Sequence, residues 1–294
     1  MRFFNTAGPC QSDIHFMLPT EARLPAARRL IERRNYFVLH APRQSGKTTI
    51  LLEMAQELTA AGRYAAVLVS VETGAAFPND LDRAELAILD SWRNSALVRL
   101  PVELQPPAWP PAAIGGRIRT ALRTWAQASP RPLVVFIDEI DALQDDVLMS
   151  VLRQLRDGYD DRPRGFPWSL ALIGLRDVRD YKVASGSSDR LHTASPFNIK
   201  AESLTLGNFT AAEVAALYAQ HTADTGQAFS DEALRLAFDL SQGQPWLVNA
   251  LARQATEVLA PDPQTPVTAD CIEAAQENLI QRQDTHFDND IKNK

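Results

Sequence analysis

The stretch from Tyr36 to Leu52, YFVLHAPRQSGKTTILL, constrains the fold of this 294-residue chain more than any other. Tyr36 to His40 is a short, mostly apolar run, which predicts a buried strand. A turn containing Pro42 and Gly46 follows, and Thr48 opens a segment in which apolar residues recur at helical spacing. The apolar positions of that segment are Ile50, Leu51, Met54, Ala55 and Leu58. The stretch therefore predicts a strand, a loop ending in Gly-Lys-Thr, and a helix, in that order.

This order of elements is the layout of a phosphate-binding P-loop. Backbone N–H groups at a helix N-terminus, together with the helix dipole, favour an anion. Gly46 keeps side chains away from the phosphates, Lys47 reaches the β- and γ-phosphates, and the Thr48 hydroxyl is a ligand for Mg²⁺. The residues predicted to contact the nucleotide here are Ala41, Pro42, Arg43, Gln44, Ser45, Gly46, Lys47, Thr48 and Thr49.

Ala41 departs from the usual pattern, which begins with glycine. Alanine is small, but it takes a positive φ at a higher cost than glycine does. A Gly-Lys-Thr sequence alone is a weak signal, and a surface turn before an ordinary amphipathic helix is the alternative. The predicted strand before the loop and the predicted helix after it favour the phosphate-binding interpretation.

A second stretch supplies acidic residues in the position that a P-loop requires. Leu133 to Ile137 is an apolar run typical of a strand buried on both faces of a parallel sheet, and Asp138 and Glu139 follow it directly. Asp138 is predicted to reach the ligand-binding edge of the sheet and to hold Mg²⁺, and Glu139 to polarise an attacking water. The alternative is a strand end that exposes two acids to solvent.

Strands and helices alternate up to about residue 206, and only helices are expected after it. Besides the two strands above, the patterns predict strands at Tyr64–Val71, Ser169–Leu175 and Phe197–Leu206. A helix is predicted over Glu21–Arg34, after an irregular N-terminal arm. The fold class is therefore α/β: a P-loop NTPase parallel sheet between helices, followed by a helical lid. The predicted domains are residues 1–206 and 207–294.

The composition limits the classes of function. A net charge of −6 argues against a nucleic-acid-binding footprint over the whole surface, although a local basic patch stays open. Cys10 and Cys271 are far apart and in no metal-ligand spacing, which is typical of free thiols in a reducing compartment. The N-terminus has no apolar core of signal-peptide length, and no apolar run is long enough to span a membrane. We therefore expect a cytoplasmic protein with no membrane partner.

Three stretches give the chain a specific resemblance. They are Leu39–Thr49, the run Arg176-Asp-Val-Arg-Asp-Tyr-Lys after the fourth predicted strand, and Gly243–Asn249, which contains Gly243-Gln244-Pro245. Through them the chain resembles the bacterial AAA-like P-loop ATPases of the additional-strand class. Within that class it is similar to the signal-transduction (STAND) and archaeal-type ATPases, and to AAA-like ATP-binding proteins of uncharacterised role. The resemblance covers roughly residues 1 to 283.

The resemblance implies roles for individual residues. Lys47 and Thr48 match the Walker A residues, Asp138 and Glu139 match Walker B, and Arg176 matches a sensor arginine that contacts the γ-phosphate. Pro245 lies in a lid motif that the family places near the adenine. In the additional-strand class a strand lies between the Walker A and Walker B strands, and Tyr64–Val71 is the candidate for it. A structural ion pair of Arg176 with Asp177 or Asp141 is the alternative for that arginine.

The function implied is ATP binding with Mg²⁺ and hydrolysis to ADP and phosphate, used as a conformational switch for a protein partner or for self-association. One alternative is a nucleic-acid-handling ATPase of the replication-loader or transposition type. Those families usually carry a winged helix after the lid, whereas the segment after the last expected helix is acidic, at Asp284, Asp288 and Asp290. A nucleotide-binding scaffold with little turnover is the other alternative, which Ala41 alone supports.

Overall fold

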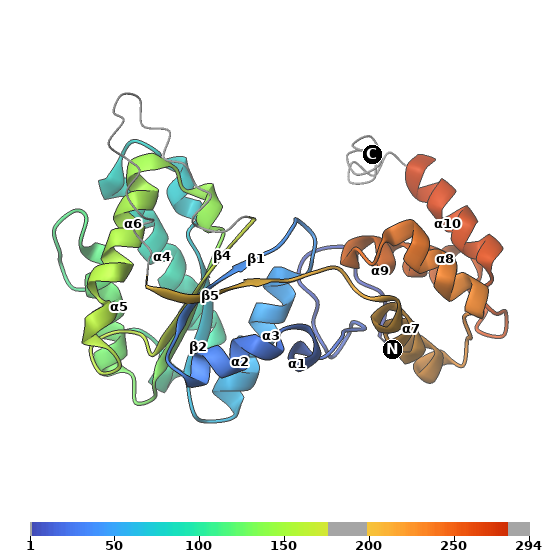
Figure 1. Ribbon diagram of the computed structural model, residues 1–294, viewed down its shortest axis with the longest axis horizontal. Coiled ribbons are helices and arrows are strands. Elements are labelled where there is room, and N and C mark those ends of the chain that lie inside the picture. Colours follow the sequence, from blue (N-terminus) through green and yellow to red (C-terminus); the bar gives the residue numbers. More distant parts are fainter. Residues whose placement is uncertain (1, 176–198, 282–294) are drawn as a thin grey trace. The chain divides into compact units, whose positions relative to one another are not determined.

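The computed structural model describes residues 2–175 and 199–281 (Figure 1). Contacts divide the chain into two compact units. The sheet unit comprises residues 24–42 and 50–206, and the helical unit comprises residues 1–23, 43–49 and 207–294. The N-terminal arm and most of the Gly-Lys-Thr loop therefore group with the C-terminal helices. The division into domains 1–206 and 207–294 stays a prediction.

The sheet unit contains five parallel strands. They are β1 (Tyr36–His40), β2 (Ala65–Ser70), β3 (Leu133–Asp138), β4 (Ser169–Gly174) and β5 (Lys200–Thr205). Their order across the sheet is β2-β3-β4-β1-β5. Each strand of the central three is a run of apolar residues that is buried on both faces, as a parallel sheet requires. The predicted α/β fold with a parallel sheet is confirmed.

Helices cover both faces of this sheet. Alternate residues of β1 point to opposite faces, so Tyr36 and Val38 join one core and Phe37 and Leu39 join another. The first core is completed by α4 (Leu81–Arg99), α5 (Arg117–Ala128) and α6 (Asp145–Asp157). The second core is completed by α2 (Pro25–Glu32) and α3 (Lys47–Ala60). The result is a three-layer arrangement with the sheet in the middle (Figure 1).

Short 3-10 helices complete the sheet unit, and α2 begins separately from the short helix before it. The 3-10 helices are η1 (Glu72–Ala76), η2 (Val102–Leu104), η3 (Ile140–Ala142) and η4 (Tyr159–Asp161). The single helix predicted over Glu21–Arg34 is wrong, because α1 (Thr20–Arg23) ends before α2 begins at Pro25. Proline has no N–H and its ring clashes with the preceding turn, so it starts a helix more readily than it continues one.

The position of β2 corrects another prediction. The strand between β1 and β3 is β4, whereas β2 lies at an edge of the sheet. The outward backbone groups of this edge are bonded by side chains. The Thr59 hydroxyl bonds Ala66 N and O, Arg99 donates to the Leu68 carbonyl at 3.2 Å, and Trp92 donates to the Ser70 carbonyl at 3.0 Å. These contacts block the addition of a further strand at this edge.

The helical unit is built from α7 (Ala211–Thr225), α8 (Asp231–Ser241), α9 (Pro245–Arg253) and α10 (Ala269–Gln281). A π-helical turn, Gln254–Leu259, continues α9. The arm belongs to the same core, because Phe4 and Phe16 are about 1% exposed and their rings contact Tyr218 and His221 of α7. Burial of two such aromatic side chains explains why the arm groups with these helices.

The helix α7 begins with a capping box. The Glu213 N–H donates to the Thr210 hydroxyl at 3.2 Å, and the Thr210 N–H donates to the Glu213 carboxylate at 2.7 Å. Arg23 also bonds Glu213, at 3.1 Å. Burial alone would raise the pKa of the Glu213 carboxyl, but the hydrogen bonds from Thr210 and Arg23 outweigh burial and lower it. The carboxylate therefore stabilises the fold in its charged form.

A Glu213→Gln variant is expected to lose about 1 kcal/mol of unfolding free energy at pH 7, since glutamine keeps the cap but not the charge. A carboxyl whose folded pKa is lowered stabilises above its unfolded pKa, and that stability is lost as pH falls through the folded pKa. The difference between the two proteins should therefore shrink as the pH is lowered below the usual pKa of a glutamate. Urea unfolding at pH 7 and at an acid pH measures it. Glu232→Gln, at an exposed pair in α8, is the control and should change little. Equal differences at both pH values would contradict the assignment.

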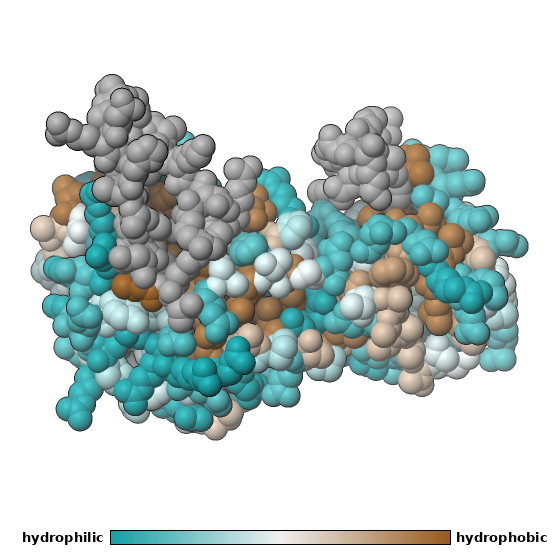
Figure 2. All heavy atoms as spheres, in the orientation of Figure 1, coloured by the Kyte–Doolittle hydropathy of each residue, from teal (hydrophilic) through white to brown (hydrophobic). Residues whose placement is uncertain are grey.

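The surface of the described residues carries apolar side chains in small groups. On the face drawn in Figure 2 these groups are separated by hydrophilic residues. Val98 and Val102, around the end of α4, are the most exposed large hydrophobic residues, at 85% and 81%. Among the described helices, none is both long enough and apolar enough to cross a bilayer.

Candidate functional site

The carboxyl edge of the sheet is where the predicted site residues of the sheet unit lie. All five strands are parallel, so β1, β3 and β4 end at the same edge. Ala41, the first residue after β1, donates its N–H to the carbonyl of Gly174 at the end of β4, at 3.2 Å. The Gly-Lys-Thr loop thus leaves β1 at the edge where Asp138 ends β3.

The acidic residues after β3 are held by backbone contacts. Asp138 is 5% exposed, and its Oδ1 accepts the N–H of Glu139 at 2.9 Å. Glu139 has a φ of 57°, in the left-handed region that a residue with a Cβ adopts at a cost. Asp141 accepts the N–H of Leu175, just after β4, at 3.2 Å. A strained residue directly after a strand at the ligand-binding edge is typical of an active site.

The backbone angles of the loop show whether Ala41 has the positive φ that glycine would favour. Among the described residues other than glycine, positive φ values occur at Arg34, Gln44, Glu139, Asp145 and Gln242, and therefore not at Ala41. The left-handed positions of the loop are Gln44, with φ 60°, and Gly46, with φ 84°. Ala41 is 1% exposed and packs in the core that holds α2 and α3. Alanine in place of glycine at this position therefore introduces no left-handed strain.

Lys47 is the first residue of α3 and is 9% exposed. A lysine is seldom buried, and a positive charge at a helix N-terminus opposes the helix dipole, so this is an unusual place for a lysine. Ser45 is 2% exposed, and its hydroxyl has no hydrogen-bond partner within the described part of the chain. Both groups are donors beside a helix N-terminus, the environment in which proteins bind phosphate.

Hydrogen bonds connect the loop to the arm and to the start of α9. The Cys10 N–H of the arm donates to the Thr49 hydroxyl at 3.1 Å, and Gln244 Nε2 donates to Gln44 Oε1 at 3.1 Å. Gln244 also accepts the Leu247 N–H, which caps α9 directly before Pro245. The pairing of two glutamines 200 residues apart had no signal in the sequence.

The turn before α9 has a strict requirement for glycine. Gly243 has a φ of 68°, and a Cβ placed on it would lie 1.8 Å from the carbonyl oxygen of Phe209. The Phe209 N–H in turn donates to the Gly243 carbonyl at 2.7 Å. The Gly243-Gln244-Pro245 turn is therefore held against the segment that leads into α7, and Gln244 is presented to the loop.

The sequence predicts the Thr48 hydroxyl and the Asp138 carboxylate as donors for a Mg²⁺ ion. Both offer oxygen, the ligand that Mg²⁺ prefers, and this ion is commonly held by one or two protein groups together with phosphate and water. The described residues contain no group of three His, Cys, Asp or Glu side chains that could hold a metal by themselves. The residues present therefore fit a Mg²⁺ ion that arrives with a nucleotide. Arg176, the predicted sensor, lies outside the described residues.

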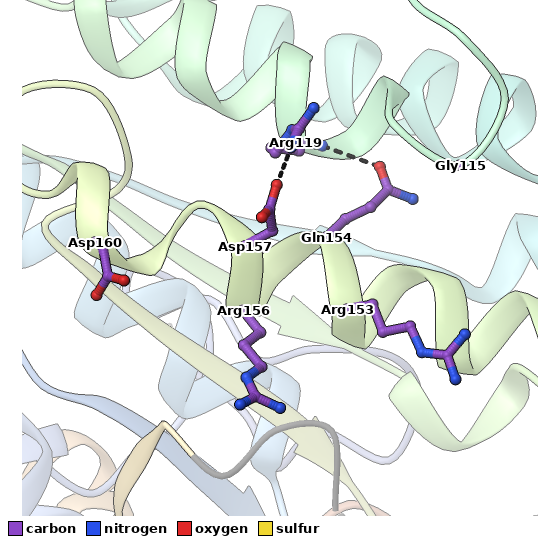
Figure 3. Close-up of a pocket in the computed structure, with 7 residues that line it drawn as sticks. All are labelled: Gly115, Arg119, Arg153, Gln154, Arg156, Asp157 and Asp160. Carbon is purple, nitrogen blue, oxygen red and sulfur yellow. Dashed lines mark hydrogen bonds and ion pairs between the residues drawn. The ribbon is translucent and has the colours of Figure 1, made fainter.

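A polar hollow of about 500 Å³ lies elsewhere on the sheet unit, between α5 and α6 (Figure 3). Arg119 of α5 is paired there with Asp157 of α6, and Gln154 accepts the Arg119 N–H and donates to the buried Glu85 at 2.6 Å. Arg153 and Arg156 point to the other side of α6 (Figure 3). The hydrogen-bonding groups facing α5 are bonded to one another, which is typical of a structural network.

Comparisons with known proteins address the fold. No protein-family profile matches the sequence, and no curated protein matches it. RuvB from Thermotoga maritima, described as a Holliday junction branch migration motor, is 18% identical; the match covers 88% of this chain and 68% of that one, with a TM-score of 0.52. A Walker-type ATPase of Pyrococcus abyssi is 11% identical, with coverages of 97% and 79% and a TM-score of 0.60. ORC1 of Aeropyrum pernix, solved in complex with DNA, is 14% identical, with coverages of 90% and 66% and a TM-score of 0.54.

These similarities establish the fold. The sheet with its flanking helices has the fold of P-loop NTPases, and the predicted fold class is confirmed. At such low identity a shared fold does not transfer an activity, so function has to be argued from the site.

Proposed function

We propose that this protein binds ATP with Mg²⁺ and hydrolyses it to ADP and phosphate. The observation that carries the proposal is Lys47, buried as the first residue of α3, directly after a loop that leaves β1 at the edge where Asp138 ends β3. A largely buried ammonium group beside a helix N-terminus suits the binding of phosphate.

Each residue of the site has its own role in binding or hydrolysing the nucleotide. The backbone from Ala41 to Thr49 surrounds the phosphates, and Lys47 and Ser45 donate to their oxygens. Thr48 and Asp138 hold Mg²⁺, which neutralises phosphate charge when bound. Glu139 orients and polarises the attacking water, and its strained backbone fixes the carboxylate at the sheet edge. Pro245 lies beside the base. Arg176 contacts the γ-phosphate, as in the STAND and archaeal-type ATPases to which we assign the chain.

The helical unit makes hydrolysis useful as a switch. Gln244, at the start of α9, bonds Gln44 of the loop that would hold the phosphates. A nucleotide in the loop would change the surroundings of Gln44, and the lid helices would respond through Gln244. The state of the lid would then be read by a protein partner or by a second copy of the chain in the cytoplasm.

The direct test is ATP hydrolysis by the purified protein, measured with and without Mg²⁺ and over a range of protein concentrations. We expect turnover that requires Mg²⁺, with a rate per molecule that reports whether the active site is shared between copies. Tight ATP binding without any turnover would instead support a nucleotide-binding scaffold, and absence of binding would refute the proposal.

A nucleic-acid-handling ATPase is the second candidate, because two similar structures are a branch migration motor and a protein solved with DNA. The net charge of −6 weighs against it. Addition of double-stranded DNA to the hydrolysis assay at two salt concentrations separates the candidates, because stimulation through phosphate contacts must weaken steeply with salt. A switch for a protein partner should show DNA-independent turnover.

A further inference from the structure

The N-terminal arm contains a buried histidine that accepts a backbone hydrogen bond. His15 is 6% exposed, and its Nδ1 lies 2.8 Å from the amide nitrogen of Gln11. A backbone amide is always a donor, so Nδ1 must supply a lone pair. The imidazole is therefore neutral in this arrangement, with its proton on Nε2. A charged imidazole has a proton on both nitrogens and cannot accept this bond.

The hydrogen bond closes a turn of the arm. The His15 N–H donates back to the Gln11 carbonyl at 2.8 Å, and the Ile14 N–H donates to the same carbonyl at 3.2 Å. The His15 ring packs edge-on against Phe3, with 4.6 Å between the ring centroids. Phe3 in turn makes backbone hydrogen bonds with Ile14 and Phe16, at 3.0 and 3.2 Å. The imidazole thus lies where the two ends of the arm are held together.

The turn begins next to the contact between the arm and the Gly-Lys-Thr loop. Gln11 directly follows Cys10, whose N–H donates to the Thr49 hydroxyl at 3.1 Å. Thr49 lies in the first turn of α3, two residues after Lys47. The N–H groups that bond His15 and Thr49 belong to adjacent peptide groups, so displacement of one disturbs the other. The arm and the loop belong to the same compact unit.

Few charged groups surround the imidazole. Burial lowers the pKa of His15, and the charge of Asp13, in the same turn, raises it by less. On α7, which packs against the arm, Asp224 is paired with Arg2 at 2.8 Å, and His221 is the other titratable group. A histidine whose folded pKa is lowered stabilises the fold above its ordinary pKa of about 6.5, and that stability is lost as the pH falls.

We propose that His15 is a pH-sensitive switch: binding of a solvent proton to its Nδ1 opens the turn of residues 11–15 and releases the arm from Thr49. The effect on nucleotide binding rests on the proposed function, because the loop that loses the arm is the one assigned to the phosphates. A loop that has lost this contact has more conformational freedom to give up on binding, so it should hold ATP more weakly in acid.

His221 provides a matched control in the same unit. It is also buried, at 8% exposure, and its Nε2 bonds Gln227 Oε1 at 2.9 Å. Gln227 Nε2 donates to three backbone carbonyls, so Oε1 is the acceptor and His221 Nε2 is the donor. A donor nitrogen keeps its proton when the ring becomes charged. Titration of His221 therefore leaves its hydrogen bond in place, whereas titration of His15 breaks one.

Amide hydrogen exchange at about pH 8 and about pH 5, the limits of the range in which histidine titrates, tests the switch. After correction for intrinsic exchange rates, protection of the Cys10 and Gln11 amides should fall at least about tenfold in acid. The amides of α10 should stay protected, which shows that the unit remains folded. His15→Asn, whose Oδ1 can accept the same N–H but does not titrate, should keep the protection at both pH values. His221→Gln should behave like the wild-type protein.

The dissociation constant for ATP, measured without Mg²⁺ on the same proteins, tests the effect on the loop. In acid the affinity should fall about fivefold further in the wild-type protein than in His15→Asn. Protonation of ATP itself affects both proteins equally and cancels in this comparison.

The outcomes separate the switch from the proposed function. Equal protection of Gln11 at both pH values, or the same loss in His15→Asn as in the wild-type protein, would overturn the switch. An equal loss of ATP affinity in wild type and His15→Asn would overturn its action on the loop while ATP binding stands. Failure of the wild-type protein to bind ATP at about pH 8 would refute the proposed function, and the exchange measurement would still decide whether the switch exists.

Discussion

A Lys47→Ala variant is expected to bind ATP about 100-fold more weakly than the wild-type protein, and to lose hydrolysis with it. The ammonium group of Lys47 is the one positive charge that the loop places at the first turn of α3, at 9% exposure. Charge-assisted hydrogen bonds to phosphate are about twice as strong as neutral ones, and partial burial strengthens them further. Alanine is a good helix former, so α3 itself should persist.

The measurement is the dissociation constant for ATP, with thermal unfolding recorded for both proteins to show that the fold is retained. Arg63→Ala is the matched control, because Arg63 follows the end of the same helix and its side chain is 63% exposed. The control should bind ATP like the wild-type protein. If Lys47→Ala also bound ATP normally, the loop would not be the phosphate site, and the surface-turn interpretation of Gly-Lys-Thr would stand.

The strands and most helices of this fold could be predicted from local sequence. The central strands are apolar runs of five or six residues, and burial on both faces leaves no other use for such runs. Thr210 and Glu213 mark the start of α7 in the sequence, because a capping box is a local pattern. Pro25 could have identified the break between α1 and α2, since proline acts on its own turn.

The order of the strands could not be predicted in the same way. The strand between β1 and β3 is β4, which follows β3 in the chain, and β2 lies at the edge although it directly follows β1 and α3. Both strands are apolar and of equal length, so nothing local distinguishes a central strand from this edge strand. The difference lies in Thr59, Arg99 and Trp92, whose side chains bond the free edge from distant positions.

The candidate site shows the same division between local and long-range information. Lys47, Thr48, Asp138 and Glu139 are predicted from their spacing relative to strands, a pattern that stays within one strand and the turn after it. The hydrogen bond between Gln244 and Gln44 is different, because it joins residues 200 positions apart. Neither glutamine lies in a local pattern that predicts this contact.

A Glu139→Gln variant is expected to bind ATP with an affinity within about threefold of wild type and to hydrolyse it at least about 100-fold more slowly. Glutamine keeps the length and shape of the side chain but cannot accept a proton from water. The N–H of residue 139 still donates to Asp138 Oδ1 in the variant, and both residue types meet a similar cost at a φ of 57°. The loss should therefore lie in kcat and leave the site intact.

Steady-state hydrolysis and ATP binding, measured on the same preparation, separate these two quantities. Glu103→Gln, at an exposed glutamate of η2 in the same sheet unit, should leave both unchanged. Normal turnover in Glu139→Gln would show that another group polarises the attacking water. Asp141 would then be the next acid to test, because it lies two residues after Glu139 and accepts the N–H of Leu175, just after β4. Normal turnover in both Glu139→Gln and Lys47→Ala would exclude this edge of the sheet as the catalytic centre. Hydrolysis at this edge requires Lys47 to bind the phosphates and Glu139 to polarise the water.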